Sequence, residues 1–113
     1  MYKTALVKTD IEDGRRVIDE IEKIIPITAA FWFYREEDDE WKLVVVSPGV
    51  EAKGPIDLYT KIALLLNDLA VDSHRPVTMP LTRITMTSTH HPTYLRIKRF
   101  GDAFNDAYIY KMS

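Results

Sequence analysis

TAAFWFYREEDDEWKLVVVS, the stretch from Thr28 to Ser47, decides the fold. Its two ends, residues 28–34 and 41–47, are rich in aromatic and β-branched side chains, which fit a pleated, half-buried surface. The residues between them, 35–40, are all charged and mostly acidic. The stretch is therefore predicted to form a β-hairpin with its turn at 35–40.

Pairing the two strands symmetrically about the turn predicts which side chains share a face of the hairpin. One face carries the pairs Tyr34 with Trp41, Trp32 with Leu43, and Ala30 with Val45. The other face carries the pairs Phe31 with Val44, and Phe33 with Lys42. Successive side chains alternate between faces, so large apolar groups on both mean that the hairpin is covered twice or keeps an apolar surface.

Composition sets the class of protein. The chain has 113 residues, 46% hydrophobic and 28% charged, which is typical of one globular domain over residues 1–113. The net charge of −2 argues against a protein that mainly neutralises phosphates. The chain has no cysteine, no apolar run near the roughly 20 residues of a membrane helix, and no signal-peptide core at its start. A cytoplasmic protein without a membrane partner is predicted.

Two long helices are predicted around the hairpin. Apolar residues recur with helical spacing from Asp10, the expected N-cap, to Ile25, and Pro26 ends the pattern. Gly14 inside this helix indicates close packing or a loose first turn. After a predicted loop, 48–55, a second helix begins at Pro55 and carries a wide apolar stripe.

The last third of the chain completes the sheet. Residues 81–87 alternate apolar and polar side chains and predict a strand, 93–100 a short helix, and 107–112 a final strand. The order α-β-β-α-β-α-β predicts an α+β fold in two layers. Its sheet is four-stranded, antiparallel or mixed, with helices mainly on one face.

Several short stretches resemble a family of small uncharacterised bacterial proteins. They are DIEDGRR at 10–16, ITAAFW at 27–32, KLVVVSP at 42–48, KGP at 53–55 and DAYIY at 106–110. The resemblance extends over about the first 65 residues and the last strand. It implies a bacterial cytosolic protein and transfers no catalytic residue to this chain.

The apolar hairpin surface leads to the principal functional prediction. A second copy of the chain can cover it, since two-fold association presents the same patch twice. The protein is thus predicted to be a homodimer with a non-catalytic interaction or regulatory role. Strand parity leaves open which face points outward, and the predicted interface residues are Phe31, Trp32, Leu43, Val44, Tyr108 and Tyr110.

An alternative is a small-ligand-binding protein or an enzyme that uses the loop 48–55, with Lys53, and the pair His90 and His91. Imidazole binds metals and shuttles protons near neutral pH. Adjacent histidines in a strand point to opposite faces, however, and no zinc-finger, His-Glu-x-x-His or facial-triad spacing completes a metal site. A helix-start or surface role is therefore favoured for both histidines, and no metal or cofactor is predicted.

A third possibility is single-stranded nucleic-acid binding on an aromatic sheet face. Stacking of bases would use Phe31, Phe33, Tyr108 and Tyr110, and nearby basic residues of 83–99 would contact phosphate. The chain lacks an RNP1-like pattern and is slightly acidic. Nucleic acid is the least favoured partner of the three.

Overall fold

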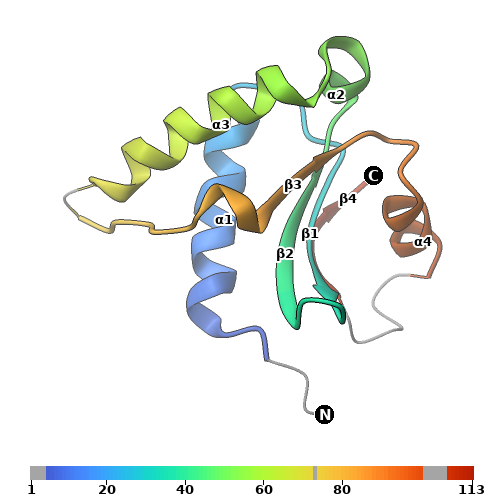
Figure 1. Cartoon of the computed structure of the whole chain (residues 1–113), viewed down its shortest axis with the longest axis horizontal. Helices are drawn as coiled ribbons and strands as arrows, with labels where there is room; N and C mark the ends of the chain where they lie inside the picture. Colours follow the sequence, from blue (N-terminus) through green and yellow to red (C-terminus); the bar gives the residue numbers. More distant parts are fainter. Residues whose placement is uncertain (1–4, 73, 101–106) are drawn as a thin grey trace.

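A computed structural model of the chain describes residues 5–72, 74–100 and 107–113 (Figure 1). In chain order its elements are α1 (Lys8–Glu22), β1 (Ala29–Arg35), β2 (Glu40–Val46), α2 (Pro48–Lys53), α3 (Pro55–Ala70), the 3-10 helix η1 (Leu81–Arg83), β3 (Ile84–Thr87), α4 (Pro92–Phe100) and β4 (Ala107–Met112). The predicted α+β class and the order of the main elements are confirmed. None of the described helices combines the length and the apolar character needed to cross a membrane.

The hairpin forms the middle of a four-stranded sheet with the order β3-β2-β1-β4. The pairing of β1 with β2 is antiparallel and has the predicted register, which includes Trp32 opposite Leu43 and Phe31 opposite Val44. The strand β4 pairs antiparallel with β1, with a bulge between Ala30 and Phe31, whereas β3 pairs parallel with β2. The sheet is therefore mixed.

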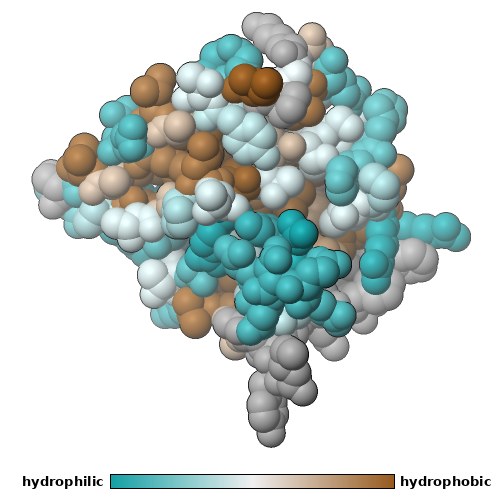
Figure 2. Space-filling view, viewed as in Figure 1, coloured by the Kyte–Doolittle hydropathy of each residue, from teal (hydrophilic) through white to brown (hydrophobic). Residues whose placement is uncertain are grey.

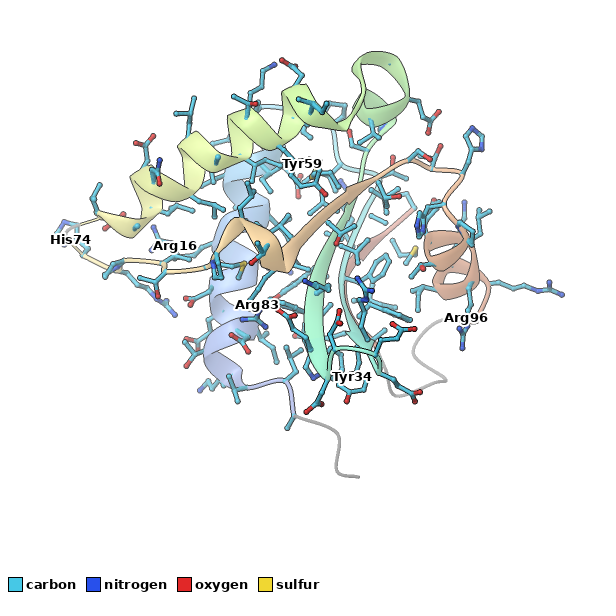
Figure 3. The ribbon with its side chains drawn as sticks, viewed as in Figure 1. Arg16, Tyr34, Tyr59, His74, Arg83 and Arg96 are labelled. Atoms are coloured by element: carbon cyan, nitrogen blue, oxygen red, sulfur yellow. The ribbon has the colours of Figure 1, made fainter. Side chains whose placement is uncertain are left out.

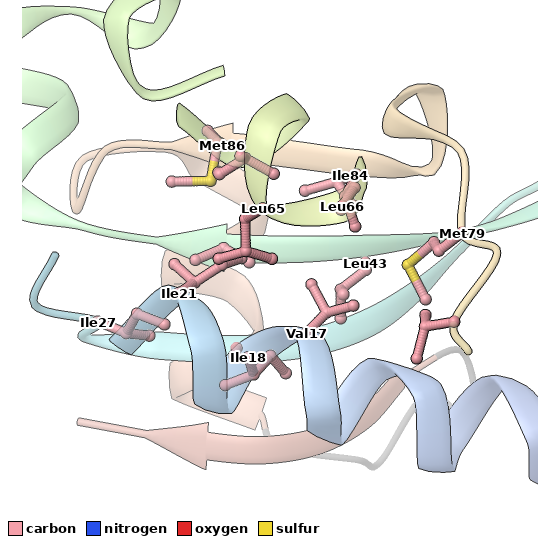
Figure 4. Close-up of a cluster of buried hydrophobic side chains, with 14 of the residues drawn as sticks. Val17, Ile18, Ile21, Ile27, Leu43, Leu65, Leu66, Met79, Ile84 and Met86 are labelled. Atoms are coloured by element: carbon pink, nitrogen blue, oxygen red, sulfur yellow. The ribbon is translucent and has the colours of Figure 1, made fainter. Parts of the chain in front are cut away.

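The hairpin is covered on both faces. The helices α1 and α3 pack on one face, where Val17, Ile18 and Leu65 meet Leu43 and the other side chains of that parity (Figure 4). On the opposite face lies α4 (Figure 1). Its Tyr94 and Ile97 are buried against a second cluster made of Ala29, Phe31, Val44 and Val46. Two of the longer helices share one face, as predicted, and α4 adds a partial third layer.

Close contact between α1 and the sheet depends on Gly14. A Cβ atom at this position would lie 2.5 Å from Tyr110 Oη and 2.9 Å from Trp32 Nε1. Those two groups also bond each other, since Trp32 Nε1 donates to Tyr110 Oη at 2.8 Å and that hydroxyl donates to Ile11 O at 2.5 Å. Of the two roles predicted for Gly14, the close packing is therefore the one observed.

The structure differs from the prediction at the start of α1 and in the loop after β2. The N-cap of α1 is Val7, so Asp10 lies in the first turn, where its Oδ1 accepts from Arg83 Nη1 at 3.0 Å. The predicted loop 48–55 contains the short helix α2, which the Ser47 hydroxyl caps by accepting from Gly49 N at 3.1 Å. Both corrections arise because tertiary contacts and a local cap outweigh the residue pattern.

The third predicted strand is also shorter than expected. Residues Leu81–Arg83 form η1, and the strand begins at Ile84. Its Ile84 and Met86 face the core as predicted, but Thr87, expected on the wet face, is buried. Gly101, which the sequence pattern also predicts as the C-terminal cap of the helix after residue 92, lies outside the described residues. The last strand, Ala107–Met112, has the predicted bounds.

Candidate functional site: a cleft between the sheet and α4

The helix α4 covers only part of its sheet face, and a cleft of about 560 Å³ remains beside it. That volume is in the usual range for sites that hold a small molecule, roughly 300–1,000 Å³. The sheet, the turn of the hairpin and the start of α4 each supply lining residues. They are Phe33, Tyr34, Arg35, Glu36, Glu37, Lys42, Val44, Thr85, Thr87, His91, Thr93 and Arg96.

The floor of the cleft combines apolar groups with hydroxyls. The parallel register sets Val44 beside Thr85 and Val46 beside Thr87. Thr87 is only 7% exposed, and no hydrogen bond involves its hydroxyl among the described residues. In the described part of the chain, every side-chain oxygen that is fully inaccessible to solvent has a hydrogen-bond partner. Because Thr87 Oγ1 has none, this atom must be reachable from the cleft that the residue lines.

Lys42 places a cationic group at the same floor. Lys42 lies opposite Phe33 in the sheet, as predicted, and its side chain is only 15% exposed. Its Nζ donates to Thr82 O at 2.7 Å and lies 3.4 Å from Glu40 Oε2. An ammonium group has three donors, so one remains for a ligand.

The wall of the cleft is the start of α4. His91 Nδ1 accepts from Thr93 N at 3.1 Å, which is the helix-start role that the sequence favoured. In the neutral imidazole this bond puts the proton on Nε2, which then acts as a donor. Arg96 projects from the next turn of the helix (Figure 3).

The rim opposite α4 is the acidic hairpin turn. It supplies both carboxylates of the cleft lining, Glu36 and Glu37, together with Arg35. Arg35 Nε lies 3.6 Å from Glu37 Oε2 and 3.5 Å from Asp38 Oδ2. The turn therefore balances much of its own charge and forms part of a hydrophilic surface (Figure 2).

His90 and the helix α2 form a separate cluster outside the cleft lining. Glu51 Oε1 accepts from Thr89 N at 2.8 Å and from the Thr89 hydroxyl, and Glu51 Oε2 lies 3.6 Å from His90 Nε2. The hydrogen bond from the Thr89 side chain lowers the pKa of Glu51. His90 itself is 83% exposed.

The ligand site predicted from the loop and the histidine pair is therefore divided. His91 lines the cleft, whereas His90 joins Glu51 of α2 at the surface. The side chain of Lys53, the third predicted residue, lies outside the described part of the structure. Within the described ranges, no three His, Asp or Glu side chains are grouped to hold a metal ion.

The predicted interface residues of the hairpin are inside the chain. Phe31, Trp32, Leu43 and Val44 are all buried, because α1 and α3 cover one parity and α4 covers the other. The expectation that a sheet face is left for a partner is thus corrected. Tyr108 is 42% exposed, and Tyr110 packs under α1.

The aromatic platform proposed for nucleic acid is not formed. Phe31 and Phe33 lie on the α4 face, whereas Tyr110 bonds Trp32 and Ile11 on the α1 face. Tyr108, opposite Trp32 in the register and with its ring 5.3 Å from that of Tyr110, shares the α1 face. The four rings therefore cannot stack a common strand of bases.

Sequence reasoning missed the threonines that define the cleft, Thr85, Thr87 and Thr93, and placed Arg96 only among the basic residues that would contact the phosphates of a nucleic acid. Strand alternation by itself accounts for the threonines of β3. One signal was present: a threonine occupies position 87, where valine, the other β-branched residue of this size, would suit a strand equally well. Only the parallel pairing with β2 shows that this position is buried beside Val46.

A second feature is the outer surface of the helical layer. Ile56, Leu64 and Val71 on and after α3 are 62–81% exposed. Ile24 and Leu64 also line a groove between α1 and α3. Hydrophobic residues are visible along this side of the molecule in Figure 2.

Comparison with protein-family models, curated proteins and solved structures found no match to this chain. The resemblance to a bacterial family gains no support from these comparisons. The function must therefore be inferred from the cleft and the surfaces themselves.

Proposed function

We propose that the protein binds a small molecule in the cleft between the sheet and α4. The observation that carries this proposal is Thr87, a mostly buried residue whose hydroxyl has no partner among the described residues and is reachable from the cleft. The proposal is of binding and assigns no reaction.

Thr87 supports a binding role because a purely structural position would not need its hydroxyl. The residue pairs with Val46 in the sheet and adjoins an apolar cluster. Valine has the same β-branched shape and is well suited to such a strand position. The Thr87 hydroxyl has no partner in the described protein, yet it can be reached from the cleft. A ligand that bonds Thr87 would give the hydroxyl a function.

Ligand binding can be tested by NMR on protein with ¹³C-labelled Val, Thr, Ile and Leu methyl groups. A library of small fragments should shift the methyl signals of Val44, Thr85, Thr87 and Thr93. The matched controls are Ile24 and Leu64, which lie on the helical side and should not move. A complete screen that leaves all four cleft signals unchanged would contradict the proposal.

A second candidate is self-association, the role predicted from the sequence, on a different surface. The exposed side chains Ile56, Leu64 and Val71 supply an apolar outer face along α3. Leu64 lies near the middle of this helix, so a two-fold axis there would repeat the same contact on both copies.

Sedimentation velocity at high micromolar concentration tests this second candidate. A dimer is expected for the unaltered chain and a monomer for Leu64→Lys, whose side chain is exposed and should leave the fold intact. Leu95→Lys, at an exposed site on α4, is the control and should stay dimeric. A monomeric unaltered chain would exclude the candidate and leave ligand binding as the proposed function.

A further inference from the structure

The geometry points to a ligand that carries a carboxylate or phosphate group, held by the floor and the α4 wall of the cleft. This inference rests on the proposed function and specifies the class of molecule. The sheet and α4 offer hydrogen-bond donors and positive charge, whereas the acidic residues of the cleft are confined to the hairpin turn.

The hydrogen-bond donors come from β2, β3 and the start of α4. From the sheet come the Lys42 ammonium, with one donor beyond its two neighbours, and the hydroxyls of Thr85 and Thr87. From α4 and the residues before it come His91 and Arg96. An arginine guanidinium presents five N–H donors in a planar fork, which matches the oxygens of a carboxylate or phosphate.

An anionic group satisfies such a set better than a neutral one. Carboxylates and phosphates have only acceptor oxygens, and hydrogen bonds from charged donors to them are about twice as strong as neutral ones. Towards a ligand that only donates hydrogen bonds, the Thr87 hydroxyl could act only as an acceptor, and its own O–H donor would stay unused. Such a ligand would also place its donors against Lys42 and Arg96.

The distribution of charge in the cleft favours an anionic group at the end near α4, away from the acidic hairpin turn. Glu36 and Glu37 repel an anion from the turn, and Arg35 beside Glu37 and Asp38 is already partly neutralised. The anionic group is therefore placed near Thr87, His91 and Arg96. The adjoining floor includes Phe33 and Val44, which suit an apolar or aromatic body on the same ligand.

Three matched probes test the inference: benzoate, phenyl phosphate and the neutral benzamide. Each is titrated into the full chain while the methyl signals of Val44, Thr85, Thr87 and Thr93 are followed. At least one of the two anions should bind about tenfold more tightly than benzamide, and added salt should weaken its binding. The preferred anion identifies the head group as carboxylate or phosphate.

Two charge-removing variants locate the anion. Arg96→Gln should weaken binding of the preferred anion by about tenfold. Lys61→Gln removes the same charge from α3, outside the cleft, and should leave the dissociation constant unchanged. Thermal unfolding of both variants checks that the fold is retained, and Arg96→Lys should recover part of the affinity through its charge.

The outcomes separate the ligand class from the proposed function. Equal or tighter binding of benzamide in the cleft would overturn the anionic class and leave ligand binding standing. Anion binding that Arg96→Gln and Lys61→Gln weaken equally would overturn the placement. If the three probes shift none of the cleft signals while other fragments do, the anionic class also fails. A blank screen with every fragment would defeat the proposed function itself.

Discussion

The two faces of the sheet treat their polar groups differently. On the α1 and α3 face, the Trp32 indole donates to the Tyr110 hydroxyl, which in turn donates to the backbone carbonyl of Ile11 in α1. Burial of Tyr110 raises its pKa to about 12, so the phenol stays neutral in this position. On the α4 face, Thr87 is a mostly buried residue, but its hydroxyl has no partner in the described structure and stays reachable from the cleft.

On the face covered by α1 and α3, hereafter the closed face, charged side chains also pair with other groups of the protein. Arg83 Nη1 donates to Asp10 Oδ1 at 3.0 Å, and its guanidinium carbon lies 4.8 Å from the centre of the Trp32 ring. At the sheet's edge, the Tyr59 hydroxyl of α3 accepts from Met86 N at 2.9 Å (Figure 3). A polar group that serves the fold is thus bonded within it. The difference teaches that the Thr87 hydroxyl, unlike the polar groups of the closed face, is not used by the described part of the fold.

The largest expected effect contrasts adjacent residues on opposite faces. Trp32→Ala should lower the free energy of unfolding by about 3–5 kcal/mol, because it empties a fully buried site. Phe33→Ala should cost only about 1–2 kcal/mol, since this ring is half-buried beside the cleft. Urea unfolding measures both, and equal losses would mean that the two faces are closed to the same degree.

A smaller effect tests how tightly α1 sits on the closed face. Gly14→Ala should destabilise the chain by about 1–3 kcal/mol through crowding against Tyr110 and Trp32, which outweighs the gain in helix propensity of up to about 1 kcal/mol. Gly49→Ala is the milder comparison and should cost less than Gly14→Ala, because its added Cβ would lie 3.3 Å from the Ser47 Oγ and would require only a small shift of that atom. A more stable Gly14→Ala chain would show that α1 is loosely packed.

The smallest effect concerns the connection that follows α3. Asp72 Oδ1 accepts from His74 N at 2.8 Å and Arg75 N at 3.1 Å, and Oδ2 accepts from Arg16 of α1 at 3.1 Å. The hydrogen bond from Arg75 N is the main cause that lowers the pKa of Asp72 from 3.8 to about 2.

A lowered carboxyl pKa stabilises the fold above the unfolded pKa. This contribution should be present above pH 3.8 and disappear as the pH falls toward 2. Asp72→Asn should therefore lose stability at pH 6 relative to the unaltered chain, and the difference should shrink toward pH 2. Chemical unfolding across that range measures it, and a difference independent of pH would show that the ionised form has no special role.

Sequence reasoning predicted the sheet well because its signals are local. The aromatic and β-branched runs around 35–40 determine the β1 and β2 register, and the last strand has clear bounds. The Asp10 cap failed because Arg83, distant in sequence, engages that side chain. The covering of Phe31 by α4 was equally hidden, since alternation shows that a face is apolar but not what packs on it.

The candidate site was predicted only in part. His91 could be selected as an imidazole near a helix start, and its position in the cleft adds to that role. The importance of Thr87 depends on a parallel pairing between β2 and β3, which lie far apart in the sequence. Spacing along the chain carries no record of such a pairing.

The fold does not need the Thr87 hydroxyl of the cleft, and a comparison with the neighbouring Ser47 hydroxyl tests this most directly. Ser47 Oγ is fully buried and donates to Pro26 O at 2.7 Å, whereas Thr87 Oγ1 has no described partner. Urea unfolding should show that Ser47→Ala loses about 1–3 kcal/mol, while Thr87→Val is unchanged within about 0.5 kcal/mol or more stable. A loss for Thr87→Val as large as that for Ser47→Ala would contradict the account.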